Sequence, residues 1–126
     1  MSVVGIGTDI IEISRIEKMA IKVRDRLALR VLTPIEYEKY QSLKTPALYL
    51  AKRWAGKEAA SKALGTGIAN GVSFQNFEIK SLVSGQPQLL LSGRAAELAT
   101  ELGAENWHIS LSDEALYATA FVVLSR

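Results

Sequence analysis

The sequence predicts an α+β fold in which a mainly antiparallel sheet packs against helices, one of them long and central. Three observations carry this prediction. Runs rich in Val and Ile lie at both ends of the chain, helical periodicity is concentrated in its first half, and a paired-strand pattern follows. Strands and helices that are grouped along a chain in this way are typical of α+β proteins. The 126 residues are expected to form a single domain, residues 1–126, with its own core.

The first half of the chain is expected to form one strand and then three helices. Their expected ranges are 3–11 for the strand and 13–27, 33–43 and 45–64 for the helices. Ser14 and Glu17 have the spacing of a capping box at the first helix start. Thr33-Pro34-Ile35-Glu36 combines an N-cap threonine, a first-turn proline and a glutamate at the third helical position. Gly65 is expected to stop the longest helix.

In the second half, turn residues separate shorter elements. We expect strands within 72–83 and over 88–91, a helix over 92–102, and closing strands over 107–111 and 116–124. In the first closing strand, His108 and Ser110 alternate with apolar residues, so one face is polar and the other apolar.

Composition excludes several classes of protein. The chain has no stretch of about 18 apolar residues, so a transmembrane helix is not expected. The N-terminus lacks the basic start of a signal peptide. Cysteine is absent, which excludes disulfides and thiolate metal sites and fits a reducing cytoplasm. With a single histidine, His108, a His-rich zinc site is not expected.

Positive charge is concentrated in one segment. The net charge is only +2, yet residues 14–31 hold six basic and two acidic side chains. On a helical wheel, one stripe is formed by Arg15, Lys18, Lys22, Arg26 and Arg30, and Met19 falls between this stripe and the apolar face. Such a stripe on a near-neutral body suggests an acidic partner that is met at one place, although an ordinary solvated helix face has the same pattern.

Two acidic residues stand in distinctive surroundings. Asp9 lies in an otherwise aliphatic strand, and Glu58 lies in an Ala-rich helix one turn before Lys62. Buried carboxylates are costly unless they are paired or bind a metal, and two of them near lysine and arginine suit Mg²⁺ and a phosphate-bearing substrate. Asp9 could instead cap a backbone turn, and Glu58 with Lys62 could be an exposed helical ion pair.

Four motifs in order resemble one known family, the holo-acyl-carrier-protein synthases, which are short 4′-phosphopantetheinyl transferases. The motifs are Gly5-Ile6-Gly7-Thr8-Asp9-Ile10, then Arg53 with Lys57-Glu58-Ala59, Lys62-Ala63 and Gly65-Thr66-Gly67, then Gly85-Gln86-Pro87, and finally His108-Ile109-Ser110-Leu111-Ser112. Each motif alone is common, whereas all four at this spacing cover nearly the whole chain and are specific. Gly56 is a departure, because the family more often has alanine there, and mid-helix glycine suggests close approach of another element.

The resemblance implies a fold, a reaction and partners. The fold is that of the 4′-phosphopantetheinyl transferases. Coenzyme A would donate its phosphopantetheine arm to a serine of an apo acyl carrier protein, leaving adenosine 3′,5′-bisphosphate, as a step toward fatty acid biosynthesis. Enzymes that look like this bind Mg²⁺ and assemble as homotrimers with active sites between subunits. The expected setting is cytoplasmic, with no membrane and no nucleic acid involved.

The resemblance also implies roles for individual residues. Asp9 and Glu58 would hold the metal, with Glu58 and Lys62 catalytic; the general base stays open between Glu58 and a metal-bound water. The coenzyme would contact Arg53, Lys57, Lys62, Gly65, Thr66, Pro87, His108 and Ser110. Without the resemblance, the Gly65–Gly67 segment would be only a helix C-cap, because the helix dipole there opposes an anion.

The basic stripe would then be the dock for the acidic carrier protein. Its expected contacts are Arg15, Lys18, Met19, Lys22 and Arg26, because complementary charge steers encounter and fixes orientation. The alternative function is a non-catalytic module whose basic helix binds nucleic acid. That alternative explains the stripe, but it leaves Asp9 and Glu58 without a role and has few aromatic residues for base stacking.

Overall fold

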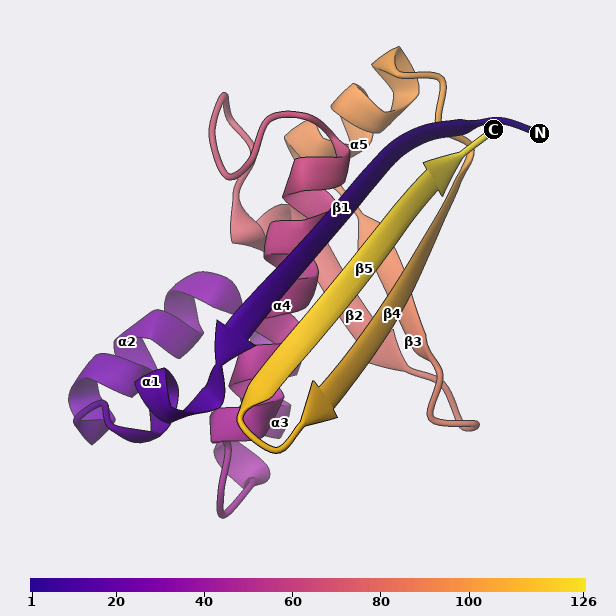
Figure 1. Ribbon diagram of the computed structural model, residues 1–126. Helices are drawn as coiled ribbons and strands as arrows, with labels where there is room; N and C mark the ends of the chain where they lie inside the picture. The colour runs from indigo at the N-terminus through magenta and orange to yellow at the C-terminus, as the bar shows by residue number, and fades with distance from the viewer.

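A computed structural model describes all residues 1–126 (Figure 1). The elements are β1 (Val3–Glu12), α1 (Ile13–Glu17), α2 (Ile21–Val31), α3 (Pro34–Ser42), α4 (Ala47–Ala63), the 3₁₀ turn η1 (Phe74–Asn76), β2 (Phe77–Ser81), β3 (Pro87–Leu91), α5 (Gly93–Glu101), β4 (Asn106–Glu114) and β5 (Tyr117–Ser125). Strands β1, β5 and β4 form an antiparallel sheet in that order, and β2 pairs with β3 in a separate antiparallel hairpin. The predicted α+β class is confirmed.

Helix α4 is the centre of the molecule. The three-stranded sheet covers one side of it, and the β2–β3 hairpin lies behind the sheet, with β2 against α4 and β3 against β4 (Figure 1). Helices α1, α2 and α3 gather at one end of α4, and α5 lies at the other end, near both chain termini. None of the helices is long and apolar enough to cross a bilayer.

The sheet has two distinct faces. On the inner face, toward α4, Asp9 of β1 is opposite Ala120 of β5, which is opposite Leu111 of β4. On the outer face, Thr8 is opposite Phe121, which is opposite Ser110. The inner residues of β5 are almost fully buried, whereas the large apolar side chains Ile6, Ile10 and Phe121 are exposed on the outer face. The polar and apolar alternation predicted for β4 is confirmed, with its apolar side inside.

Helix α4 packs closely because its residues are small. The side chains Ala51, Ala55, Ala59 and Ala63 are buried, and a β-carbon added at Gly56 would lie 2.6 Å from Ile79 Cδ1. Side chains of β2 and β4 thus approach the helix closely at position 56, as the sequence suggested. Gly65 ends the helix in a left-handed conformation with φ +84°, as predicted.

The predicted helix over residues 13–27 is wrong in one respect, because the structure breaks it into α1 and α2. Ile16 of α1 and Ala28 of α2 are both fully buried. A change of direction between them lets both reach the same core, while Val23 of α2 is exposed. Ser14 is not a cap: its hydroxyl donates to Glu12 Oε1 at 2.6 Å, and Glu12 is the N-cap residue. The capping box at Thr33 and Glu36 is confirmed.

A buried ion pair joins the helices to the hairpin. Lys57 is fully buried, and its Nζ donates to Glu36 Oε1 at 2.6 Å and to the Val31 carbonyl at 2.7 Å. The same carboxylate accepts from the backbone N–H groups of Thr33 and Ile79. Burial lowers the pKa of the Lys57 ammonium, and the Glu36 carboxylate opposes that shift. Four elements, namely α2, α3, α4 and β2, therefore meet at this ion pair.

We predict that Lys57→Met lowers the free energy of unfolding by about 3–5 kcal/mol, because it leaves the Glu36 carboxylate buried without its cation. Urea denaturation would measure this loss. The double variant Glu36→Gln/Lys57→Met buries no charge and should lose less than Lys57→Met. Lys52→Met, which removes a partly exposed lysine of the same helix, is the control and should cost no more than about 1 kcal/mol. Equal losses for Lys57→Met and Lys52→Met would contradict the prediction.

Candidate functional site

The candidate site lies where β1 crosses α4. Trp54, Glu58 and Lys62 follow one another at four-residue spacing, so they share a side of the helix. A β-carbon at Gly7 would overlap the carbonyl oxygen of Ala59, and one at Gly5 would overlap that of Ala63. The glycines of β1 therefore let the strand lie directly on the helix backbone, which brings the inner-face residue Asp9 to this side of α4.

Asp9 and Lys62 are in direct contact. Lys62 Nζ donates to Asp9 Oδ1 at 2.9 Å and to the Thr8 carbonyl at 3.1 Å. The Asp9 side chain is only 17% exposed, whereas that of Lys62 is 51% exposed. The carboxylate is thus held at the bottom of the site, and the ammonium group lies at its solvent edge, where it is free to meet an anion.

Glu58 faces the same place. Burial raises the pKa of Glu58, and the nearby Asp9 carboxylate raises it further, while Lys62 and the indole N–H of Trp54 lower it. The two carboxylates thus converge and repel each other, a situation that a bound cation relieves. No cluster of three or more His, Asp or Glu side chains surrounds them. Mg²⁺ typically takes one or two protein carboxylates and completes its shell with water and phosphate oxygens, so this donor set fits it.

The glycine-rich segment after α4, for which a coenzyme contact at Gly65 and Thr66 is predicted, forms a helix C-cap in this structure. The backbone N–H of Gly65 donates to the Lys62 carbonyl, and those of Thr66 and Gly67 donate to the Ser61 carbonyl. The Thr66 hydroxyl donates to the Gly67 carbonyl at 2.8 Å. These donors cap the helix and are not free for an anion in this structure, which is the C-cap that the physical argument alone favoured.

His108 and Ser110 lie on the outer face of β4, on the opposite side of the sheet from Asp9. His108 Nε2 is 3.4 Å from Ser125 Oγ. His108 also lines a hollow of about 220 Å³ with Pro87 and the adjoining part of the β2–β3 hairpin. The structure therefore brings Pro87 and His108 together, as two of the predicted coenzyme contacts, but it separates both from Asp9 and Glu58 of the same chain.

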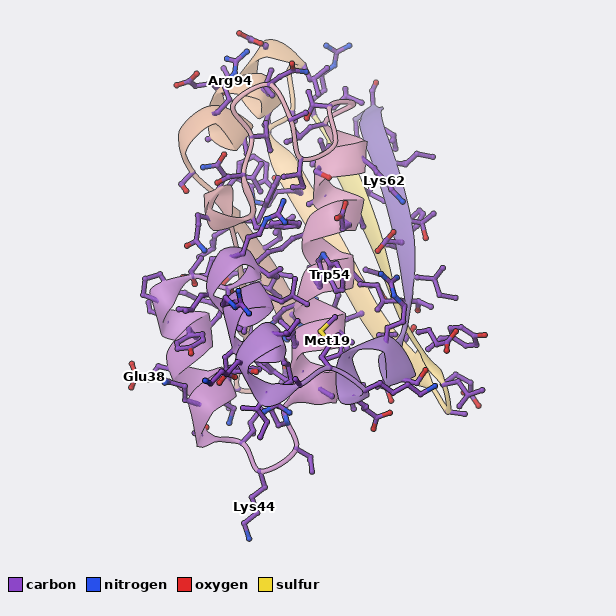
Figure 2. All side chains as sticks on the ribbon, turned by 90° about the vertical axis from the view of Figure 1, so that its left-hand side faces the viewer. Met19, Glu38, Lys44, Trp54, Lys62 and Arg94 are labelled. Atoms are coloured by element: carbon purple, nitrogen blue, oxygen red, sulfur yellow. The ribbon has the colours of Figure 1, made fainter.

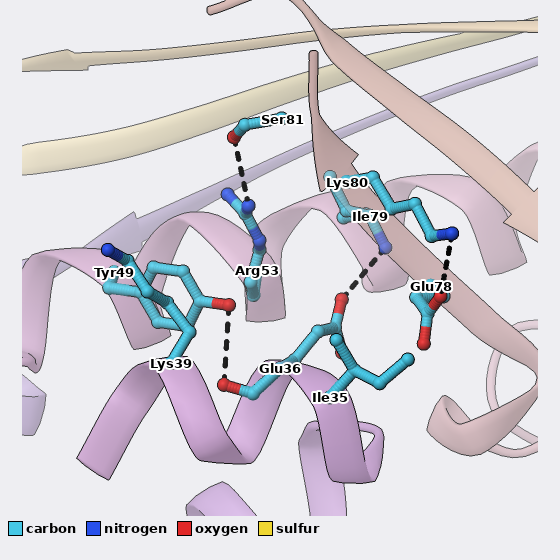
Figure 3. A pocket seen from close by; sticks show the side chains of 9 residues that line it. All are labelled: Ile35, Glu36, Lys39, Tyr49, Arg53, Glu78, Ile79, Lys80 and Ser81. Carbon is cyan, nitrogen blue, oxygen red and sulfur yellow. Dashed lines mark hydrogen bonds and ion pairs between the residues drawn. The ribbon is translucent and has the colours of Figure 1, made fainter. Parts of the chain in front are cut away.

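Arg53 lies in a pocket of about 440 Å³ between α3, α4 and β2 (Figure 3). The pocket is lined by Ile35, Glu36, Lys39, Tyr49, Arg53, Glu78, Ile79, Lys80 and Ser81. The guanidinium group lies 4.6 Å from the centre of the Tyr49 ring and donates to Ser81 Oγ at 3.3 Å, while its Nε is buried without a partner. Arg53 thus has an unused donor beside a pocket. Lys57, by contrast, is fully buried in its ion pair and offers a coenzyme no surface, so the predicted contact is corrected.

The predicted carrier-protein contacts are distributed over two helices. Arg15 belongs to α1, Lys18 and Met19 follow it, and Lys22 and Arg26 belong to α2. The four basic side chains are exposed and Met19 is partly buried. Arg15 lies over the ring of Trp54, 5.6 Å from its centre. Sequence reasoning gave Trp54 no role, although its spacing from Glu58 was the available signal.

The sequence and the fold of the chain both match proteins of a known family. A model of the 4′-phosphopantetheinyl transferase superfamily matches residues 5–121, and the chain belongs to this superfamily. The holo-[acyl-carrier-protein] synthase of Photorhabdus laumondii subsp. laumondii is 51% identical over 126 residues, covering 100% of both chains. Within the superfamily, the chain is a member of the holo-[acyl-carrier-protein] synthases.

Solved structures give the same result. The holo-[acyl-carrier-protein] synthase of Neisseria meningitidis superposes with a TM-score of 0.88 at 40% identity, covering 99% of this chain and 100% of that one. The Helicobacter pylori enzyme in complex with coenzyme A superposes with a TM-score of 0.79 at 33% identity, covering 95% and 99%. The fold that the resemblance implied is therefore confirmed.

We predict that Glu58→Gln is more stable than the wild type at pH 7–8 when divalent cations are removed. Folding raises the pKa of Glu58 above its unfolded-state value of about 4.3. The contribution of protonated Glu58 to stability is therefore fully present below the unfolded-state pKa, and it is lost as the pH rises through the folded-state pKa. Melting temperatures measured against pH in EDTA should converge below about pH 4, where wild-type Glu58 is protonated. Glu105→Gln, at an exposed position, is the control. A wild type at least as stable as Glu58→Gln across this range would contradict the prediction.

Proposed function

We propose that this chain transfers the 4′-phosphopantetheine group of coenzyme A to a serine of an apo acyl carrier protein, in the cytoplasm and in support of fatty acid biosynthesis. The observation that carries the proposal is the convergence of Asp9, Glu58 and Lys62 in a chain of this family. A nucleic-acid-binding module would have no use for two carboxylates held together in this way.

The proposed reaction breaks the phosphoanhydride P–O bond of the coenzyme's diphosphate and forms a phosphate ester bond to the serine oxygen. The serine oxygen attacks the phosphorus that carries the pantetheine arm, and adenosine 3′,5′-bisphosphate leaves with the electrons of the broken P–O bond. Mg²⁺ held by Asp9 and Glu58 would offset the negative charge of the diphosphate and of the leaving group. Lys62 adds a positive charge at the solvent edge of the site, where the diphosphate would enter.

The serine proton needs an acceptor, and Glu58 is our candidate. Burial and the Asp9 carboxylate raise the pKa of Glu58, which makes it a better proton acceptor than an ordinary exposed carboxylate. In the same helix turn, Lys62 keeps Asp9 in place through its 2.9 Å hydrogen bond. Asp9 and Glu58 would thus hold the cation, Lys62 faces the incoming diphosphate, and Glu58 is also the candidate acceptor for the proton.

Mass spectrometry of an apo carrier protein incubated with this protein, coenzyme A and Mg²⁺ tests the proposal. We expect a phosphopantetheine mass shift on one serine. Asp9→Ala and Glu58→Ala should reduce turnover by orders of magnitude, because each removes half of the carboxylate pair, while circular dichroism shows an intact fold. Glu97→Ala, on the distant helix α5, is the matched control and should act normally. Near-normal turnover of both site variants at limiting Mg²⁺ would contradict the proposal that Asp9 and Glu58 bind Mg²⁺.

The proposed coenzyme site is shared between chains of a homotrimer. His108, Ser110 and Pro87 would contact the coenzyme from one chain, and Asp9 and Glu58 would come from its neighbour, since His108 and Ser110 lie on the opposite face of the sheet from Asp9. Arg53, with its free donor beside the pocket, is proposed as a further phosphate contact. The apolar surface available for assembly is the outer face, where Ile6, Ile10 and Phe121 are exposed.

The apolar side of β4 is not available for a subunit contact, because Trp107, Ile109 and Leu111 pack inside the chain. The exposed apolar residues come instead from β1 and β5, and they share the outer face with the polar residues of β4. A neighbour that covers Phe121 would therefore also approach Ser110, its partner across the strands.

We predict that inactive Asp9→Ala and inactive His108→Ala chains, when mixed and allowed to exchange, regain part of the activity. A hybrid trimer contains boundaries at which intact Asp9 of one chain meets intact His108 of another. Mixing Asp9→Ala with Glu58→Ala is the control and should give no rescue, because both residues belong to the same side of the boundary. Light scattering should report a trimer. A monomer mass, or no rescue despite proven exchange, would contradict the shared site.

The carrier protein is proposed to dock on the basic residues of α1 and α2. Acidic carrier side chains would meet Arg15, Lys18, Lys22 and Arg26, and Met19 would supply an apolar contact. Arg15 lies over Trp54, one turn before Glu58, so this surface leads directly to the metal site. Figure 2 shows Met19, Trp54 and Lys62 on one side of the molecule, with Arg94 at the far end.

We predict that reversing the charge of Arg15 and Lys22 raises KM for the carrier protein and leaves KM for coenzyme A nearly unchanged. The wild-type KM for the carrier should also rise with salt, because exposed charges are screened beyond about 8–10 Å at physiological ionic strength. Arg94→Glu reverses a charge away from this surface and should leave both constants unchanged. A carrier KM that responds neither to salt nor to the reversals would show that the stripe is only a solvated face.

A further inference from the structure

One buried donor near the site has no partner. The indole Nε1 of Trp54 is inaccessible to solvent and makes no hydrogen bond. The N–H of a buried tryptophan usually finds an acceptor, because losing its hydrogen bond to water without replacement is unfavourable. Simple packing does not require a tryptophan here, since a phenylalanine would fill space without burying a donor. The N–H of Trp54 therefore calls for an explanation.

The nearest functional group is the Glu58 carboxylate. Trp54 precedes Glu58 by one turn of α4, so their side chains are neighbours on the helix surface. The indole N–H of Trp54 lowers the pKa of Glu58, so the indole lies close to the Glu58 carboxylate. No hydrogen bond joins the two groups in this structure. Arg15 lies over the ring at 5.6 Å and helps to fix its plane. The donor is thus held within reach of an acceptor that can move.

We propose that Trp54 is a positioning residue for Glu58: its indole N–H donates to one carboxylate oxygen of Glu58 when the other oxygen turns toward the bound metal. The inference rests on the metal role proposed above for Glu58. The hydrogen bond restricts the rotation of a partly exposed side chain and leaves a single oxygen for the cation. A buried donor left unpartnered in the metal-free chain would then gain its partner on binding.

The indole N–H can be observed directly, because the chain has only two tryptophans. In ¹⁵N-labelled protein the two indole resonances are assigned with the Trp107→Phe variant, and the spectrum is recorded before and after addition of Mg²⁺ with coenzyme A. We expect the Trp54 indole proton to move downfield and to exchange more slowly with solvent. This measurement uses the wild-type fold and does not depend on turnover.

Outcomes of this titration separate the two proposals. If backbone resonances around Asp9 respond and the Trp54 indole does not, the positioning role is overturned and the metal site stands. If neither responds, the metal site fails and the positioning role fails with it. Trp54→Phe, which keeps the ring and removes the donor, should raise the Mg²⁺ concentration for half-maximal activity by roughly 3- to 10-fold, the effect of one hydrogen bond, with kcat at saturating Mg²⁺ largely retained. A Mg²⁺ requirement within twofold of the wild type would also overturn it.

Discussion

The buried ion pair between Lys57 and Glu36 is the contact on which the rest of the structure depends. It connects α4 to the start of α3, to the end of α2 through the Val31 carbonyl, and to β2 through the Ile79 N–H. Each charge is desolvated, so the pair is favourable only while all of these partners stay in place. It therefore fixes the rotation of α4 relative to the helices and the hairpin around it.

The rotation of α4 about its axis decides which way Glu58, the residue after Lys57, points. Successive residues of a helix point about 100° apart, so burying Lys57 toward α3 turns Glu58 toward β1. One helix thus has a structural side, on which Lys57 pairs with Glu36 and Gly56 packs against Ile79, and a candidate functional side with Trp54, Glu58 and Lys62. The site depends on the core in a physical sense, because a shift of α4 would separate Glu58 from Asp9.

The sheet imposes a second constraint. Because strand residues alternate between faces, Asp9 and His108 project to opposite sides, and no rearrangement of side chains can join them within one chain. Exposed apolar residues lie on the same face as His108. The outer face of the sheet is therefore expected both to contact a neighbouring subunit and to contribute His108 to the proposed coenzyme site. Arg15 over Trp54 connects the proposed docking helices to the side of α4 that carries Glu58.

The sequence by itself determined the α+β class, most element positions and the Thr33 capping box, and it singled out Asp9, Glu58 and Lys62 as candidates. These follow from local rules, namely periodicity, caps and the cost of burying a carboxylate. Only the tertiary structure decided which basic residues are free: Lys57 and Lys62 look alike in the sequence, yet one is fully buried and the other is half exposed. It also decided the break between α1 and α2 and the unpartnered N–H of Trp54. Burial and partners depend on residues distant in the chain, and no local pattern encodes them.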